Sequence, residues 1–202
     1  PSMSVSDDKI EVFDQKRLAM FEAAAGAEFE RSTSMLNADP PDHTRLRRLV
    51  SKAFTPSSIE ALRPRVQQLV DAMLDPMAER GTGDVVTELA FPLPFDVISE
   101  MLGMPDADKE QIAAWSGAVV KTLDPIISDD EIVAAIEGSR EMEAHIDQVI
   151  AWKRDHPADD LLSALIAAEE DGDRLSSIEL RDQVVLLFIA GHETTVNLIG
   201  TG

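Results

Sequence analysis

The chain has 202 residues, of which 44% are hydrophobic and 28% charged, so it can form one domain with a core or part of a larger one. Its formal net charge of −20 argues against a nucleic-acid surface or an anionic membrane as the main partner. The absence of cysteine excludes disulfides, zinc–cysteine sites, iron–sulfur clusters and thiol nucleophiles within this chain. The longest wholly apolar run, Val184 to Ala190, is far shorter than a membrane span, and no secretion signal is visible, so we expect a cytoplasmic protein.

The first part of the chain predicts loop followed by a helix. Residues 1–38 are mixed and weakly periodic, which favours loop with a short helix or two. The Asp39-Pro40-Pro41-Asp42 stretch is typical of a helix start, because proline suits the first turn of a helix and not its interior. A helix over about 42–54 is therefore expected.

Three later helix starts carry the same pattern, a serine followed three residues later by a glutamate. In such a capping box the serine side chain accepts from a first-turn N–H, and the glutamate reaches back to the main chain of the serine. The pairs are Ser57 with Glu60, Ser128 with Glu131, and Ser176 with Glu179. They predict helices over about 58–80, 129–155 and 177–202.

The segments between these helices give weaker signals. The spacing of Val85, Val86, Leu89 and Phe91 suggests an edge strand that runs into a helix at about 95–103. Further helices are expected over about 106–123 and, after the Asp155-His156-Pro157 break, from Asp159 onward; Asp171-Gly172-Asp173 then predicts a surface turn. The whole pattern predicts a mainly α fold.

The last predicted helix contains the stretch "VVLLFIAGHETT". Residues 184–190 leave no polar stripe, which predicts a segment buried on all sides, yet Glu193 and Thr194 follow at once. A threonine in a helix can donate to the carbonyl four residues back, here Ala190. If another group claims that hydroxyl, the carbonyl is freed, a water can enter and the helix bulges. Gly191 lets another body approach the backbone closely.

Two interpretations of this cluster stay open. It can be a groove across a core helix, lined by an acid and an alcohol that carry protons to a bound reactant. It can also be a helix that leaves the core, with Glu193 simply reaching water. A zinc site is a weaker third interpretation: His192-Glu193 begins an HExxH pattern, but Val196 stands where the second histidine belongs, so no metal site is predicted.

A second cluster lies in "DPPDHTRLRRLVSKAF", Asp39 to Phe54. His43 and Arg47 are four residues apart, so they share one helix face and could hold one anionic group together. Positive charge on neighbouring faces comes from Arg45, Arg48 and Lys52. The alternative is an ordinary amphipathic helix that turns its apolar side inward; that side consists of Leu46, Leu49, Val50 and Phe54.

Taken together and in this order, the motifs resemble those of the cytochrome P450 superfamily, the haem-thiolate monooxygenases. "AGHETT" at 190–195 resembles the oxygen-binding helix of that family, which here would be the helix over 177–202. "DPPDHTRLRRLVSKAFTP" at 39–56 resembles its haem-propionate helix in the soluble bacterial class. "FPLPFDVISEMLGMP" and "DDLLSALIAAEEDGDRLSSIEL" are similar to stretches found at corresponding places. The resemblance implies that residues 1–202 are one helical segment of a larger monooxygenase domain, ending before the haem-ligating cysteine loop.

The resemblance also implies roles for individual residues. His43 and Arg47 would donate hydrogen bonds to the propionates of haem b. Glu193 and Thr194 would be the catalytic acid–alcohol pair that delivers protons to dioxygen. The oxygen groove would be formed by Ala190 and Gly191, and His192 would need no role of its own.

Substrate and partner follow from the same resemblance. A small hydrophobic organic substrate would be hydroxylated or epoxidised, bordered by residues 10–37, 120–128 and those before Gly191. An acidic electron donor of the ferredoxin type would bind at the face formed by Arg45, Arg48 and Lys52.

One departure from the family keeps a second hypothesis open. The family holds its iron through a cysteine thiolate, and this chain has no cysteine for the axial position. The alternative function is a haem-free helical module that binds a partner or a hydrophobic ligand.

Overall fold

The structure is a computed structural model that describes residues 33–104, 109–121, 127–170 and 173–202; the predictions for residues 1–32 lie outside this part. The elements in chain order are the 3-10 helix η3 (Met35–Asn37), α2 (Asp42–Ala53), α3 (Pro56–Arg80), the π-helix η4 (Val86–Ala90), α4 (Pro92–Met101), α5 (Lys109–Lys121), α6 (Asp129–Asp155), α7 (Leu161–Ala167), β1 (Glu169–Glu170), β2 (Asp173–Arg174) and α8 (Ser177–Thr201). The mainly α fold is confirmed.

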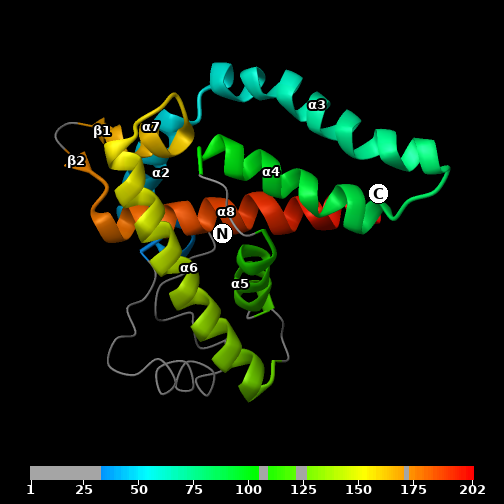
Figure 1. Cartoon of the computed structure of the whole chain (residues 1–202). Helices are drawn as coiled ribbons and strands as arrows, with labels where there is room; N and C mark the ends of the chain where they lie inside the picture. The colour runs from blue at the N-terminus through cyan, green and yellow to red at the C-terminus, as the bar shows by residue number, and fades with distance from the viewer. Residues whose placement is uncertain (1–32, 105–108, 122–126, 171–172) are drawn as a thin grey trace.

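Helix α8 is the central element of the fold. It packs against α4, α5, α6, α7 and η4, whereas α3 lies at the periphery and contacts α4 and η4 (Figure 1). The core is formed where α4, α6 and α7 meet α8, and its fully buried side chains include Phe95, Met142, Leu162, Val184 and Phe188. The fold therefore places the predicted oxygen-binding helix in the middle of the packing.

Two of the three predicted capping boxes are confirmed. Those of Ser128 and Ser176 are both present, and they start α6 and α8 at the expected residues. The box predicted at Ser57 is wrong, because Thr55 caps α3 instead and pairs reciprocally with Ser58. Pro56 follows Thr55 and suits the first position of a helix, so the start moves two residues upstream. Glu60 pairs with Arg63 at 2.7 Å.

The predicted strand at 85–91 is also wrong, because Val86–Ala90 form the π-helix η4. The local reason is a cap. The Asp84 carboxylate accepts from the N–H of Val86 at 2.9 Å, and Glu88 reaches back to the N–H of Asp84 at 2.9 Å. These bonds hold the pKa of both carboxyls below their usual values. An aspartate before an apolar run was the sequence signal for a helix start here.

The remaining predicted elements are present with adjusted ends. Helix α5 covers the described part of the helix expected over 106–123. Helix α7 begins at Leu161, since the Asp160 side chain caps it by accepting from the N–H of Ser163 at 2.8 Å. The predicted turn at 171–173 lies mostly outside the described residues. Strands β1 and β2 flank it as a short antiparallel pair that the sequence did not predict.

The prediction that residues 184–190 are buried on all sides is wrong. Val184 and Phe188 are fully buried, but Val185, Leu187 and Ile189 are only partly so, and Ala190 is exposed. By length and composition α8 could cross a membrane, a test that core helices of soluble proteins also pass. The described residues leave one side of this apolar helix uncovered.

Candidate functional site

The site on α8 is organised by helical geometry. Successive residues of an α-helix are rotated by about 100°, so residues four apart share a face. Leu180, Val184, Phe188 and His192 form a buried stripe at four-residue spacing. On the opposite side the exposed residues include Ala190, Thr194 and Leu198. Glu193 lies between the two faces, with 23% of its side chain exposed.

Thr194 and Ala190 are joined within the exposed face. The Thr194 hydroxyl donates to the Ala190 carbonyl at 2.5 Å, the arrangement expected when no other group claims the hydroxyl. The helix accordingly runs without a break from Ser177 to Thr201. The acid and the alcohol are thus adjacent, and the alcohol faces away from the packed core.

Gly191 lies on a different side of α8 from Ala190. A Cβ built on Gly191 would approach the Cδ1 of Ile98, on α4, to 3.3 Å. The close approach predicted at Gly191 is therefore present, and the group that approaches is the buried side chain of Ile98. Ala190 lies on the exposed face and Gly191 does not, and the role of both residues in an oxygen groove stays a prediction.

His192 occupies the most enclosed position of the cluster. Its ring is fully buried against the rings of Phe91, Phe95 and Phe188, at centroid distances of 5.1, 5.8 and 6.3 Å. Neither ring nitrogen has a hydrogen-bond partner among the residues that the structure describes. Burial lowers the pKa of His192. The Glu193 carboxylate and the main chain of Phe91 act in the opposite direction, although neither makes a well-aligned hydrogen bond to the ring. No role was predicted for His192 from the sequence, although the spacing 180, 184, 188, 192 marks it as the next member of the buried stripe.

The second predicted cluster lies on α2. Arg47 is exposed and His43 is half-buried, and within the described residues no polar partner is recorded for either side chain. On the other side of the helix, Leu46, Leu49 and Val50 are buried, so the amphipathic interpretation holds as well. Helix α2 therefore buries its apolar face and presents cationic donors on the opposite face.

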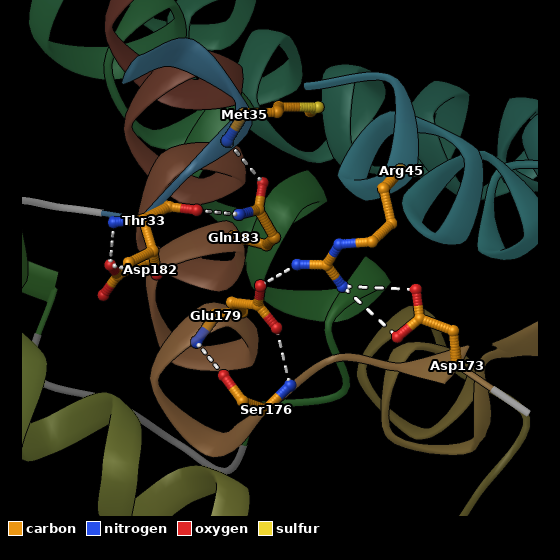
Figure 2. A network of polar contacts seen from close by, with 8 residues as sticks. All are labelled: Thr33, Met35, Arg45, Asp173, Ser176, Glu179, Asp182 and Gln183. Atoms are coloured by element: carbon orange, nitrogen blue, oxygen red, sulfur yellow. Dashed lines mark hydrogen bonds and ion pairs between the residues drawn. The ribbon is translucent and has the colours of Figure 1, made fainter. Parts of the chain in front are cut away.

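Arg45 does not belong to an open cationic face. Its guanidinium pairs with Glu179 at the start of α8 and with Asp173 of β2, the latter at 3.4 Å (Figure 2). Glu179 is also the capping residue of α8, so one carboxylate fixes both the helix start and its attachment to α2. Arg48 and Lys52 remain exposed on α2. The Arg45 guanidinium is therefore engaged in contacts within the fold, and the binding of an electron donor at this helix stays a prediction.

Two buried side chains of α8 hold the segment before α2. Asp182 accepts from the main-chain N–H of Thr33 at 2.6 Å and from its hydroxyl at 3.0 Å. The Gln183 amide accepts from the N–H of Met35 at 3.1 Å and donates to the carbonyl of Thr33 at 3.3 Å (Figure 2). Neither residue was predicted from the sequence. Polar groups next to a wholly apolar run were the available signal, because buried polar side chains need partners.

The two predicted clusters occupy different parts of the fold. Helix α2 packs on α7 and η3, whereas His192 lies against Phe91 and Phe95, at and just before α4. In the described chain α2 is linked to α8 through Arg45 at the start of α8, not near Glu193 and Thr194. No group of three or more potential metal ligands occurs among the described residues.

The described residues meet part of what a haem would require. Haem carries anionic carboxylates, which suit the two donors His43 and Arg47 on α2. The small side chain of Ala190 leaves an exposed face on α8 next to an acid and an alcohol. The axial thiolate has no counterpart, since the chain contains no cysteine.

Comparison of the sequence with known proteins gave consistent relatives, although no family model matches the chain. It is 48% identical to cytochrome P450 107B1 of Saccharopolyspora erythraea over 186 residues, covering 92% of this chain and 44% of the relative. It is 45% identical to the cytochrome P450 monooxygenase PikC of Streptomyces venezuelae, covering 87% of this chain and 41% of PikC. The chain thus spans less than half the length of the curated relatives it matches.

The solved structures that are similar to this chain are also cytochromes P450. The polyketide synthase cytochrome P450 PksS of Bacillus subtilis superposes with a TM-score of 0.73 at 37% identity, over 96% of this chain and 47% of PksS. P450BioI, solved in complex with an acyl carrier protein that carries hexadec-9Z-enoic acid, gives a TM-score of 0.77 at 31% identity, over 97% and 47%.

Proposed function

The chain belongs to the cytochrome P450 superfamily and has the helical part of its fold, and from this premise we propose that it forms part of a haem-dependent monooxygenase. Such an enzyme inserts one oxygen atom of dioxygen into a small hydrophobic organic substrate, by hydroxylation or epoxidation. The observation that carries the proposal is the exposed face of α8, on which Thr194 and Ala190 stand beside Glu193.

Glu193 and Thr194 act as the acid–alcohol pair. Haem, when bound, supplies the iron at which dioxygen is activated. The Thr194 hydroxyl donates to the Ala190 carbonyl and can turn toward a reactant, because it lies on the exposed face of α8. Glu193 is partly exposed, so it can exchange protons with water and pass them to the hydroxyl.

His43 and Arg47 hold the anionic groups of the cofactor. Both are donors on one face of α2, and arginine binds a carboxylate through two parallel hydrogen bonds. Arg45 ties this helix to α8, which fixes the position of the two donors. The axial cysteine lies outside these 202 residues in this proposal.

The partners follow the same reasoning. The exposed charges of Arg48 and Lys52 on α2 suit an acidic electron donor of the ferredoxin type, which electrostatic steering would bring to this helix. A cytoplasmic location agrees with such a donor. Because the chain is strongly acidic overall, a cationic helix gives the donor a defined place to bind.

A second function rests on a separate observation. The exposed apolar side chains include Leu198, Val85, Val86 and Phe91, and the chain has no cysteine. A haem-free helical module could use this apolar surface to bind a protein partner or a hydrophobic ligand.

The spectrum of the haem protein separates the two functions. The complete haem-loaded protein, reduced under carbon monoxide, should show the Soret band typical of thiolate ligation. The 202-residue chain alone should bind haem weakly and show no such band, since donors to the carboxylates cannot replace an axial ligand. A haem-bound complete protein without the thiolate band would rule out the monooxygenase.

Thr194→Ala tests the proton path in that complete protein. Electron consumption should uncouple from product formation, with peroxide released, while substrate binding persists. Thr195→Ala is the matched control, since the neighbouring threonine lies on a different side of α8 and is half-buried. Coupling that stays unchanged in Thr194→Ala would remove Thr194 from the path.

A further inference from the structure

The ring of His192 is a buried polar group without a partner. It is fully buried, and neither Nδ1 nor Nε2 makes a hydrogen bond within the described structure. A buried donor or acceptor left unsatisfied costs about 1–3 kcal/mol, and native proteins contain few of them. Such a residue needs an explanation beyond filling space.

Packing alone does not explain a histidine at this position. The ring meets Phe91 and Phe95 edge-on, at interplanar angles of 81° and 89°, and it follows Phe188 by one helical turn. These neighbours are aromatic and uncharged, so a phenylalanine would make similar contacts without an unsatisfied nitrogen. The imidazole nitrogens must therefore serve something near the ring.

The main chain of Phe91 also acts on the ring, and the ionisable group within reach in the described part of the chain is Glu193. Its Oε1 lies 3.9 Å from Nδ1 of His192, and of the described ionisable groups it is the one that acts electrostatically on the ring. A movement of the carboxylate by about 1 Å would complete a hydrogen bond. Glu193 lies between the buried face and the exposed face of α8, so its flexible side chain can turn to either.

We propose that His192 is a positioning residue for Glu193, donating from Nδ1–H to the carboxylate when that side chain turns inward. The bond draws the acid away from the Thr194 face. His192 thereby sets the relative populations of two orientations of the Glu193 side chain, one toward the interior and one toward the exposed face. The consequence for catalysis rests on the proposed function, whereas the contact itself does not.

Nitrogen NMR of the imidazole in the 202-residue chain tests the contact without any cofactor. The His192 ring, assigned by the loss of its signals in His192→Phe or His192→Gln, should carry its proton on Nδ1. In Glu193→Ala the population should shift toward the Nε2–H tautomer, because the acceptor is gone. Thr194→Ala, which keeps the carboxylate, should leave the tautomer unchanged. A ring protonated on Nε2, or one indifferent to Glu193→Ala, would overturn the proposal.

The pH profile of coupling tests the consequence in the haem-loaded protein. In His192→Phe, the pH profile of coupling should shift, since the carboxylate loses its interior donor and its position relative to Thr194 changes. In a Glu193→Ala background the same substitution should add no shift. If His192 has only a structural role, the pH profile of coupling should not shift in either background, and that result would overturn its positioning role. If the wild-type protein lacks the thiolate spectrum, the proposed function fails and the NMR result stands by itself.

Discussion

Three successive residues of α8 lie in three different environments. His192 is buried among aromatic rings, Glu193 is partly exposed, and Thr194 is exposed and bonded to the Ala190 carbonyl. Each step of about 100° around the helix moves the next side chain to another face. An interior ring, a flexible acid and an outward alcohol are thereby placed side by side without any break in the helix.

Burial of neutral histidines should make stability depend on pH. Burial lowers the pKa of His192 and of His145 below their ordinary value of 6.5. The unfolded chain then binds more protons than the folded chain as pH falls below that value, so the free energy of unfolding should decrease between about pH 7 and 5. Asp84 and Glu88, with ordinary values of 3.8 and 4.5, contribute at lower pH.

Urea denaturation of wild type and His192→Phe at several pH values measures this dependence. The variant should show a shallower fall over the same interval, because one of the two histidines no longer takes up a proton on unfolding. It should also be no less stable at pH 7, since phenylalanine leaves no unsatisfied nitrogen. Parallel pH curves for the two proteins would contradict the assignment.

At the residue scale the sequence anticipated the bond of Thr194 but not the buried stripe that ends at His192. The bond from Thr194 to the Ala190 carbonyl depends only on residues four apart, and the spacing 180, 184, 188 and 192 was the available signal for the stripe. The position of Gly191 could not be predicted, because it depends on Ile98, which is distant in sequence. A glycine indicates that another group approaches the backbone closely, but it does not identify that group.

Helix α2 is held to α8 by one charged contact that has two functions. Glu179 caps α8 through the N–H of Ser176 and also pairs with Arg45, whose side chain is 27% exposed. The pair is better shielded from solvent than an ordinary surface salt bridge, so it should contribute more than the few tenths of a kcal/mol typical of those.

A double-mutant cycle can isolate this contact. Glu179→Gln retains capping ability and removes the charge, so it should affect the ion pair and not the helix start. Arg45→Gln and Glu179→Gln should each lower the free energy of unfolding by about 1 kcal/mol, and the double variant should lose no more than the worse single one. Strictly additive losses in thermal or urea unfolding would show that the residues act separately.

The junction of α4, α6 and α7 is closed around a glycine. Gly103 follows α4 with a φ of 60°, and a Cβ at this position would overlap the side chains of Asp160 and Lys153. Those two side chains form a buried ion pair at 2.6 Å that links the end of α6 to the start of α7. Gly103 is thus required both for its backbone conformation and for the space it leaves.

Alanine at three glycines separates these two requirements. Gly103→Ala should destabilise by 2 kcal/mol or more, since strain and overlap add, on the order of the larger core effects. Gly81→Ala, with a φ of 70° and no atom near its Cβ, should cost about 1 kcal/mol from strain alone. Gly117→Ala, on open space within α5, should stabilise by about 0.5–1 kcal/mol. Equal losses at Gly103 and Gly81 in thermal unfolding would rule out the overlap.

At the scale of elements the capping serines were good predictors, and apolar spacing without a cap was not. The starts of α6 and α8 follow from residues three apart. The strand expected at 85–91 failed because the Asp84 and Glu88 bonds to the main chain favour a helical start over an extended one. Short apolar runs are ambiguous between strand and helix, so the polar residues before them decide.

The whole chain combines a strong negative charge with an exposed apolar surface. Leu198 is 72% exposed near the end of α8, and Val85 and Val86, at the start of η4, are 46% and 48% exposed. Apolar patches favour association, while a net charge of −20 opposes it through repulsion between copies.

The balance should depend on salt. Added salt screens the repulsion and leaves apolar contact intact, so the 202-residue chain should associate more at high ionic strength. Leu198→Gln, which keeps the net charge, should reduce that association. Size-exclusion chromatography with light scattering at low and high salt gives the measurement. Association that weakens with salt would point to charged contacts and contradict this expectation.

At the scale of the whole molecule the sequence predicted the fold class through the order of its motifs, and not the contacts between them. The pair of Arg45 with Glu179 joins residues 134 positions apart, and the bonds of Asp182 and Gln183 to Thr33 and Met35 span still more. Such contacts follow from how helices pack, which periodicity in one helix does not encode.

The continuity of α8 also limits which length changes its sequence can accept. Loss or gain of one residue between Ser176 and His192 would rotate the later residues of α8 by about 100° relative to its capped start. The His192 ring would then leave its position among the rings of Phe91, Phe95 and Phe188. Exchanging one side chain for another disturbs a single environment. Insertions and deletions should therefore be selected against throughout this interval, even where individual substitutions are tolerated.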